Sequence, residues 1–284
     1  MGVNDDAIRV WNEIIYPKIK RGRHIFVAAA DKHSRVALER HPARPGERVL
    51  DVGCGFGETS IQLARAVAPG GSVLGADCVE AMLEIGRGDA RAAGVGNVEF
   101  LNCDAASHPF GASFDFVFSR FGTMFFNLPV PALRNLRAAV KPGGRFMMIV
   151  WRTIDDNPWT GIPKQVARRH LPPPPDDGQK CGPGPFSMAD QEMVTAQLRS
   201  AGLVDPKFER VDVEMLVGRS EDEAVDFQLS LGPAGEIVRE AAELGVEKRP
   251  AIEADLRKAV APYLTPEGVV MPSSSWCITC TCAG

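Results

Sequence analysis

The residues best suited to chemistry in this chain are three glycines that follow an acid at the end of a predicted strand. The segment 49–59 reads VLDVGCGFGET. Its first, apolar residues are typical of a buried strand, and Gly53, Gly55 and Gly57 let the chain turn sharply. A helix is expected from Thr59. Such a turn leaves the main chain bare, so a ligand can lie against it, and the segment indicates a nucleotide-cofactor site.

The spacing of these glycines argues against one common cofactor class. A dinucleotide-binding turn carries a third glycine three residues after the second, and Glu58 occupies that position here. A nicotinamide oxidoreductase with a pyrophosphate cradle is therefore disfavoured. An ordinary strand-to-helix turn is the remaining alternative, because glycine-rich turns recur across α/β folds.

Two further predicted strands also end on an acid. Asp77 closes the apolar stretch 72–76, about twenty residues after the turn, where an acid can accept hydrogen bonds from both ribose hydroxyls. It could instead cap the helix expected over 79–93. Asp104 follows the strand expected over 97–102 and could accept a hydrogen bond from an adenine amino group. An Asp at such a place is otherwise a common turn residue.

A fourth predicted strand, 114–118, brings the segment 119–123 to the same edge. The carboxyl ends of parallel strands meet at one edge of a doubly wound sheet, and ligands bind there. Four strand ends in succession carry suitable side chains, which favours one composite site over four unrelated turns.

Together, these segments resemble class I S-adenosylmethionine-dependent methyltransferases, and 49–59 resembles their motif I. The likeness covers about 48–151, where the core is related to the ubiquinone and menaquinone methyltransferases. The segments 119–126 (SRFGTMFF) and 182–188 (GPGPFSM) resemble a broad group of the same class. The resemblance implies that the acid and turn of motif I hold the amino acid end of S-adenosylmethionine. The expected cofactor contacts are Asp51, Gly53, Cys54, Gly55, Gly57, Thr59, Asp77, Cys78, Met82, Asp104, Ala105, Ser119 and Arg120.

The resemblance implies an α/β fold with a doubly wound, mostly parallel, seven-stranded sheet and helical additions. We expect a helical lid over 1–44, the cofactor-binding core over 45–151, a cap insertion over 152–186 and the rest of the sheet over 187–284. A helical insertion at about 219–272 would interrupt that last part and could form a homo-oligomer interface.

The local pattern predicts several of these elements. Helical spacing of apolar residues predicts a lid helix over 5–20, which Pro17 should kink or stop, and a second over 23–39. Ser187 is expected to cap a helix over 188–201.

Composition narrows the choice of partner. The net charge over 284 residues is −4 and no stripe of Lys and Arg is present, so a small-molecule acceptor is favoured over nucleic acid. No signal-peptide core and no apolar run of membrane-spanning length is found in the sequence, which predicts a cytoplasmic protein without a membrane partner.

Seven cysteines, an odd number, predict free thiols in a reducing compartment. Cys277 and Cys280 lie in an alternating, strand-like segment that would point them to opposite faces, so no zinc or other metal site is expected. Cys54, Cys78 and Cys103 adjoin predicted cofactor residues. Free cysteines usually act as small apolar side chains that fill space in the core. The alternative is an arsenite-type metalloid methyltransferase that uses the thiols.

The implied reaction transfers a methyl group from S-adenosylmethionine to an O, N, S or C atom of a small-molecule acceptor, mainly by proximity in a closed, dry pocket. If a base is needed, His33 is the first candidate and His24 the second, although one His on an amphipathic helix is more often a packing residue. A catalytically idle S-adenosylmethionine-binding partner protein is the alternative. Aromatic candidates for the acceptor pocket are Trp11, Tyr16, Phe121, Phe125, Trp151 and Trp159.

Overall fold

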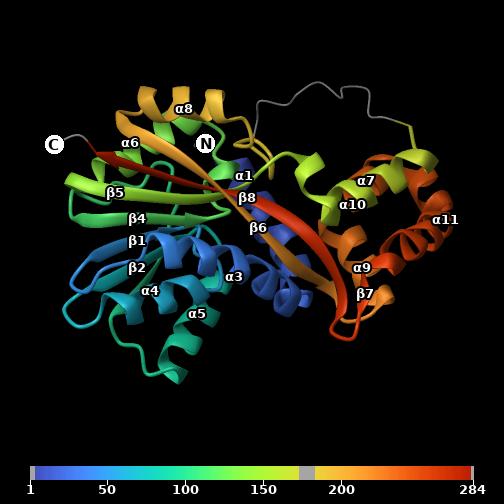
Figure 1. Ribbon diagram of the computed structural model, residues 1–284, viewed down its shortest axis with the longest axis horizontal. Coiled ribbons are helices and arrows are strands. Elements are labelled where there is room, and N and C mark those ends of the chain that lie inside the picture. The colour runs from blue at the N-terminus through green and yellow to red at the C-terminus, as the bar shows by residue number, and fades with distance from the viewer. Residues whose placement is uncertain (1–3, 173–182, 283–284) are drawn as a thin grey trace.

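The computed structural model describes residues 4–172 and 183–282. A single sheet runs through the protein, with helices on both faces (Figure 1). The strand order is β3-β2-β1-β4-β5-β8-β6. Strands β1 to β5 are parallel, and β8 runs antiparallel to both β5 and β6. The predicted α/β, mostly parallel sheet is confirmed, and the short β7 is an addition that pairs with β8. The strands are β1 Arg48–Val52, β2 Ser72–Asp77, β3 Val98–Asn102, β4 Phe114–Arg120, β5 Val140–Trp151, β6 Leu203–Gly218, β7 Leu264–Thr265 and β8 Gly268–Cys282.

Helices cover the two faces of the sheet. Helices α3, α4 and α5 lie on one face, and α6 and α8 lie on the other (Figure 1). Buried apolar side chains from strands and helices form the core on each face. The helices are α3 Arg23–Arg40, α4 Glu58–Val67, α5 Glu80–Ala92, α6 Pro129–Ala138 and α8 Gln191–Ser200.

Four further helices form a lobe at the end of the molecule reached by β6 and β8 (Figure 1). The lobe joins two separate stretches of sequence: the Nε2 atom of His170 lies 2.9 Å from the Asp255 carboxylate, and Gln228 donates to the carbonyl of Trp159 at 2.6 Å. The two predicted insertions thus pack together. The lobe contains α7 Pro158–His170, α9 Glu221–Leu231, α10 Pro233–Glu240, α11 Ala242–Val260 and the 3₁₀ turns η3 Ile154–Asp156 and η4 Ala261–Tyr263.

The first lid helix contains a π-helical turn that the sequence did not predict. It runs through α1 Asp5–Val10, a π-helical turn η1 Trp11–Ile15 and α2 Tyr16–Arg21. Pro17 does not stop the helix. It lies in the first turn of α2, where its missing N–H costs no helical hydrogen bond, and the irregular π turn comes just before it.

The start of one other helix is also corrected. Helix α8 begins at Gln191, since the Asp190 carboxylate accepts the N–H of Met193 at 2.7 Å, whereas Ser187 donates instead to the carbonyl of Met124. The proline-rich segment 172–178, which its sequence predicts to be a stiff extended loop, lies from residue 173 on outside the described residues.

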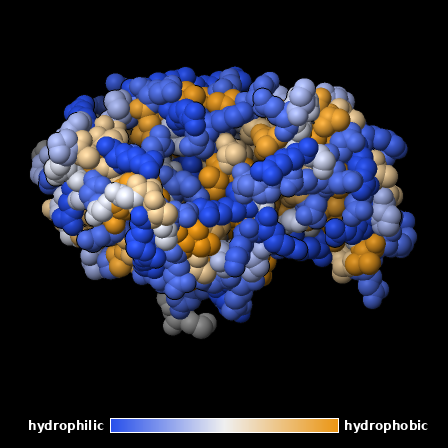
Figure 2. Space-filling view, turned by 90° about the horizontal axis from the view of Figure 1, so that it is seen from below, coloured by the Kyte–Doolittle hydropathy of each residue, from blue (hydrophilic) through white to orange (hydrophobic). Residues whose placement is uncertain are grey.

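The surface seen from below is mainly hydrophilic, with hydrophobic side chains in small groups (Figure 2). Within the described ranges, no helix is both long and apolar enough to cross a membrane.

Candidate cofactor and acceptor site

The glycine turn between β1 and α4 has the left-handed backbone that its sequence predicts. Gly53, Gly55 and Gly57 have φ values of 68°, 57° and 79°. A Cβ on Gly53 would lie 3.0 Å from the Cα of Gly122, and a Cβ on Gly57 would lie 2.6 Å from the Phe100 ring. Gly53 and Gly57 are therefore required by packing as well as by the turn.

Gly55 differs from its two neighbours because the space beside it is open. A Cβ there would meet only the Sδ atom of Met82, at 3.9 Å. In the first turn of α4, the Thr59 hydroxyl is buried and has no hydrogen-bond partner among the described residues. The open space beside Gly55, at the start of a helix and close in sequence to an unpaired hydroxyl, fits a ligand with a polar, charged end.

Asp51 lies near the end of β1 and is 1 % exposed. Its carboxylate accepts a hydrogen bond from the Ser60 hydroxyl at 2.6 Å. Burial raises the pKa of Asp51 to about 6, although Ser60 and Arg120 act in the opposite direction. A carboxylate in this position would be stabilised by a ligand that brings a positive charge, such as the ammonium group of an amino acid.

Asp77, the last residue of β2, holds the backbone of the turn in place. One carboxylate oxygen accepts the N–H of Gly55 and the other accepts the N–H of Val79, both at 2.9 Å. Burial raises the pKa of Asp77. Val79 directly precedes α5, so the bond to its N–H agrees in part with the alternative prediction that Asp77 caps this helix. Each carboxylate oxygen still has a lone pair for a ligand hydroxyl.

Asp104 follows β3 and already accepts three hydrogen bonds. The donors are the side-chain amide of Asn4 at 2.8 Å, the Ser107 hydroxyl at 2.7 Å and the N–H of Ala106 at 3.0 Å. Ala105 is buried beside it. Sequence reasoning missed Asn4, which is one hundred residues away in the chain and carries no local signal.

The cysteines near the turn are protonated thiols. Burial raises the pKa of Cys78 and of Cys103 to about 12, and it raises that of Cys54 well above its usual value. No group of three or more metal-binding side chains occurs in residues 4–172 and 183–282. In β8, Cys277 packs in the core on one face of the sheet and Cys280 on the other, as the alternation predicts.

The first lid helix covers the edge of the sheet at this site. Trp11 lies edge-on to Phe125, with ring centroids 5.0 Å apart, and Ile19 is buried against Phe56 and Met82. The side-chain amide of Asn12 donates to the carbonyl of Cys78 at 3.0 Å. Tyr16 joins the same apolar cluster.

Arg23, at the start of α3, links the lid to the helices that follow the turn. Its guanidinium bonds the carboxylate of Glu58 at 2.8 Å and that of Asp89 at 2.6 Å, and it lies 4.8 Å from the centroid of the Phe56 ring. Neither Arg23 nor Asn12 was predicted, because both act on residues remote in sequence.

His33 is fully buried between α3 and β8. Its Nε2 lies 2.9 Å from the Ser273 hydroxyl, and its Nδ1 lies 2.8 Å from the Ser275 hydroxyl. Ser273 donates its own proton to the carbonyl of Val213. His33 therefore donates from Nε2 and accepts at Nδ1, as a neutral ring. Burial lowers the pKa of His33 to about 3.

Three other polar candidates are placed differently. His24 pairs with Glu223 of α9 at 2.9 Å and so faces the lobe. Arg120 ends β4 and makes one long hydrogen bond, 3.4 Å, to the Ser34 hydroxyl. Ser119 is buried and donates to the carbonyl of Val52, which ties β4 to the glycine turn.

The aromatic candidates fall into two groups. The ring centroids of Phe121 and Trp151 are 3.9 Å apart, and those of Trp151 and Trp159 are 5.3 Å apart. In the second group, Trp11 of the lid contacts Phe125 and lies in the same apolar cluster as Tyr16. Phe121 has a φ of +58°, a strained value for a bulky residue. A strained backbone at Phe121 indicates that the surrounding residues hold the chain in place directly after β4.

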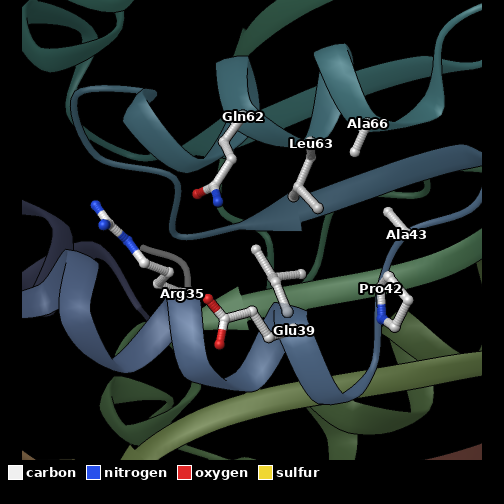
Figure 3. A pocket seen from close by; sticks show the side chains of 8 residues that line it. Arg35, Glu39, Pro42, Ala43, Gln62, Leu63 and Ala66 are labelled. Atoms are coloured by element: carbon white, nitrogen blue, oxygen red, sulfur yellow. The ribbon is translucent and has the colours of Figure 1, made fainter.

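A cavity of about 240 Å³ lies elsewhere, between α3 and α4 (Figure 3). Arg35 and Glu39 come from α3, and Gln62 comes from α4. None of the residues that line it is a predicted cofactor contact. The lining residues are Arg35, Leu38, Glu39, Pro42, Ala43, Gln62, Leu63 and Ala66.

Residues 49–144, which hold the turn and the strand ends, match the methyltransferase domain family. This part of the chain is therefore similar to methyltransferase domains. The demethylmenaquinone methyltransferase of Bacillus cytotoxicus is 33 % identical over 150 residues, which are 46 % of this chain and 62 % of that protein. The ubiquinone/menaquinone biosynthesis C-methyltransferase UbiE of Pseudomonas fluorescens is 39 % identical over 117 residues, or 40 % of this chain and 46 % of that protein. The chain thus spans about half to three fifths of these relatives.

The solved structure of the YcgJ protein from Bacillus subtilis has the same fold. It superposes with a TM-score of 0.56 at 18 % identity, and the alignment covers 89 % of this chain and 99 % of that one. The likeness therefore extends beyond the matched domain to most of the chain.

Proposed function

We propose that the protein binds S-adenosylmethionine along the carboxyl edge of the sheet and transfers its methyl group to a small-molecule acceptor. The observation that carries this proposal is the succession of acids on neighbouring strands. Asp51, Asp77 and Asp104 stand at the ends of β1, β2 and β3, which are adjacent in the sheet. We assign them, in order, to the amino acid, ribose and adenine parts of the cofactor.

The proposed cofactor contacts divide by role. Asp51, Thr59 and the open space beside Gly55 receive the amino acid end, while Asp77 receives the ribose and Asp104 the adenine amino group. Asn4 occupies one oxygen of Asp104 and would share or yield it when adenine arrives. Cys54 contributes backbone atoms, since its thiol is buried.

Bound S-adenosylmethionine supplies a sulfonium that is already an excellent leaving group. The residues of this chain therefore need only to align the acceptor and exclude water. The lid side chains Trp11, Tyr16 and Ile19 cover the edge and serve the second purpose.

His33 stays a candidate base, but its hydrogen bonds favour a positioning role. Both ring nitrogens are occupied by serines of β8, and a group whose pKa is about 3 is a weak base at neutral pH. We therefore propose that His33 fixes α3 against β8, and that proximity carries most of the rate.

The names of the relatives make a quinol-type ring the first acceptor to test. Calorimetry with S-adenosylhomocysteine, followed by transfer of labelled methyl to a panel of phenols, quinols, amines and thiols, tests the proposal. Micromolar binding with turnover is expected. Binding without turnover on any acceptor would favour the idle partner protein, and absence of binding would refute the cofactor site.

A further inference from the structure

The hydroxyl of Thr123 is buried and has no hydrogen-bond partner among the described residues. Thr123 is 3 % exposed and begins the 3₁₀ turn η2 Thr123–Phe125, directly after Gly122. Polar groups buried at this level are almost always paired, because an unpaired hydroxyl loses its hydrogen bonds to water. A ligand that pairs this hydroxyl would recover the loss.

The residue before Thr123 contacts the glycine turn. A Cβ on Gly122 would lie 2.8 Å from the carbonyl oxygen of Val52 and 3.2 Å from the Cα of Gly53. The end of β4 is therefore in close backbone contact with the end of β1, and Thr123 follows that contact at once.

The strand order shows which side of the cofactor this is. Along the sheet, β3 and β2 lie on one side of β1, and β4 lies on the other. If adenine and ribose are bound at β3 and β2, the segment after β4 lies past the amino acid end, on the side left for the acceptor. This step rests on the proposed function.

Aromatic rings stand on both sides of Thr123 in the chain. Phe121 stacks on Trp151, and Phe125 meets Trp11 of the lid. A hydroxyl flanked in the chain by two such aromatic residues suits a flat acceptor that carries one group able to pair with it.

We propose that the Thr123 hydroxyl accepts a hydrogen bond from an O–H or N–H group on a flat, conjugated acceptor and so positions the acceptor for methyl transfer. The contact orients the acceptor and takes no proton from it. Thr123 is then a specificity-determining residue that distinguishes acceptors with a donor from those without one.

Two ligands and two variants test this inference. The probes are 2-methylhydroquinone and its dimethyl ether, which differ in their O–H donors, titrated into protein saturated with S-adenosylhomocysteine. Thr123→Val removes the hydroxyl and keeps the shape. Thr160→Val is the matched control, since Thr160 of α7 is 1 % exposed and its hydroxyl is also unpartnered among the described residues.

The wild type should bind the hydroquinone at least tenfold more tightly than the ether, and Thr123→Val should lose that preference while Thr160→Val keeps it. The Tm of ligand-free Thr123→Val should equal or exceed that of the wild type, and its affinity for S-adenosylhomocysteine should be unchanged. An unchanged preference in Thr123→Val, or equal binding of both probes by the wild type, would overturn the inference. A tenfold loss of S-adenosylhomocysteine affinity would assign the hydroxyl to the cofactor instead. Wild type that fails to bind S-adenosylhomocysteine refutes the proposed function itself.

Discussion

Asp77 has two roles at the residue scale, since it supports the turn and stands where the ribose is proposed to bind. Asp77→Ala should weaken S-adenosylhomocysteine binding by about tenfold or more, because charge-assisted hydrogen bonds contribute roughly 1.5–3 kcal/mol. The Tm should also fall, as the N–H groups of Gly55 and Val79 lose their acceptor. Calorimetry and thermal melts measure the two effects.

Asp115→Ala is a matched control for that variant. The Asp115 carboxylate also accepts a backbone N–H, from Arg48 at 2.8 Å, but it lies at the start of β4, towards the opposite edge of the sheet. This variant should lower the Tm and leave the affinity unchanged. If both variants behave in that way, Asp77 is a turn residue only.

Asp51 gives the site a pH dependence. The pKa of Asp51 in the ligand-free protein is about 6, so the carboxyl becomes neutral as the pH falls below 6. It then loses its attraction for the ammonium group of the cofactor. Affinity for S-adenosylhomocysteine should therefore decrease between pH 7 and pH 5, by up to about tenfold for the pH unit below 6. Asp51→Asn should bind weakly with a flatter profile, and parallel profiles would exclude Asp51 as the titrating group.

At the scale of elements, the two helices predicted as a lid differ in how far they belong to the core. The helix over 5–21 covers the site, whereas α3 is part of the core: Ile25 and Ala37 are buried, and His33 bonds to β8. Deletion of residues 1–21 should therefore leave a folded protein that binds cofactor weakly and does not turn over. Deletion of 1–40 should prevent folding.

Circular dichroism, calorimetry and the methyl transfer assay measure these outcomes. A shorter truncation with normal affinity and turnover would show that the first helix is no lid. A folded protein lacking 1–40 would show that the sheet does not need α3.

Elements with a strong local signal were predictable from the sequence. The strands that end on acids and the turn at Gly53 to Gly57 depend on neighbouring residues, and the structure has them where the pattern places them. The prediction that Ser187 caps α8 was wrong because its hydroxyl donates to the carbonyl of Met124, which is distant in sequence. The same reason hid Asn4, Asn12 and Arg23 from sequence reasoning, since each bonds to a residue tens of positions away.

At the scale of the whole molecule, the start and the end of the chain meet at His33. The imidazole joins α3 to β8 across 240 residues, and β8 extends from the sheet to the lobe. The sequence shows a His on an amphipathic helix, but only the fold shows that two serines of a later strand enclose it. Its protonation is therefore linked to the stability of the entire fold.

The sign of that linkage follows from the two pKa values. His33 has an ordinary pKa of 6.5 when unfolded and about 3 when folded. Above pH 6.5 both states are neutral and the shift has no effect. As the pH falls from 6.5 towards 3, the unfolded state takes up the proton first, so the folded state is destabilised by up to about 1.4 kcal/mol per pH unit. Asp51 acts in the opposite direction between pH 6 and 3.8, because its folded pKa is raised.

A variant without a titrating side chain at position 33 separates the contribution of His33 from that of Asp51. His33→Gln should be less stable than the wild type at pH 7.5, since it cannot reproduce both serine hydrogen bonds, but the difference should shrink as the pH falls below 6.5. Urea unfolding at pH 7.5, 6.0 and 5.0 measures it, with His24→Gln as the control for loss of an imidazole at the surface. A difference that stays constant across this range would show that His33 takes up its proton equally in both states, and that the joint between α3 and β8 does not depend on a neutral ring.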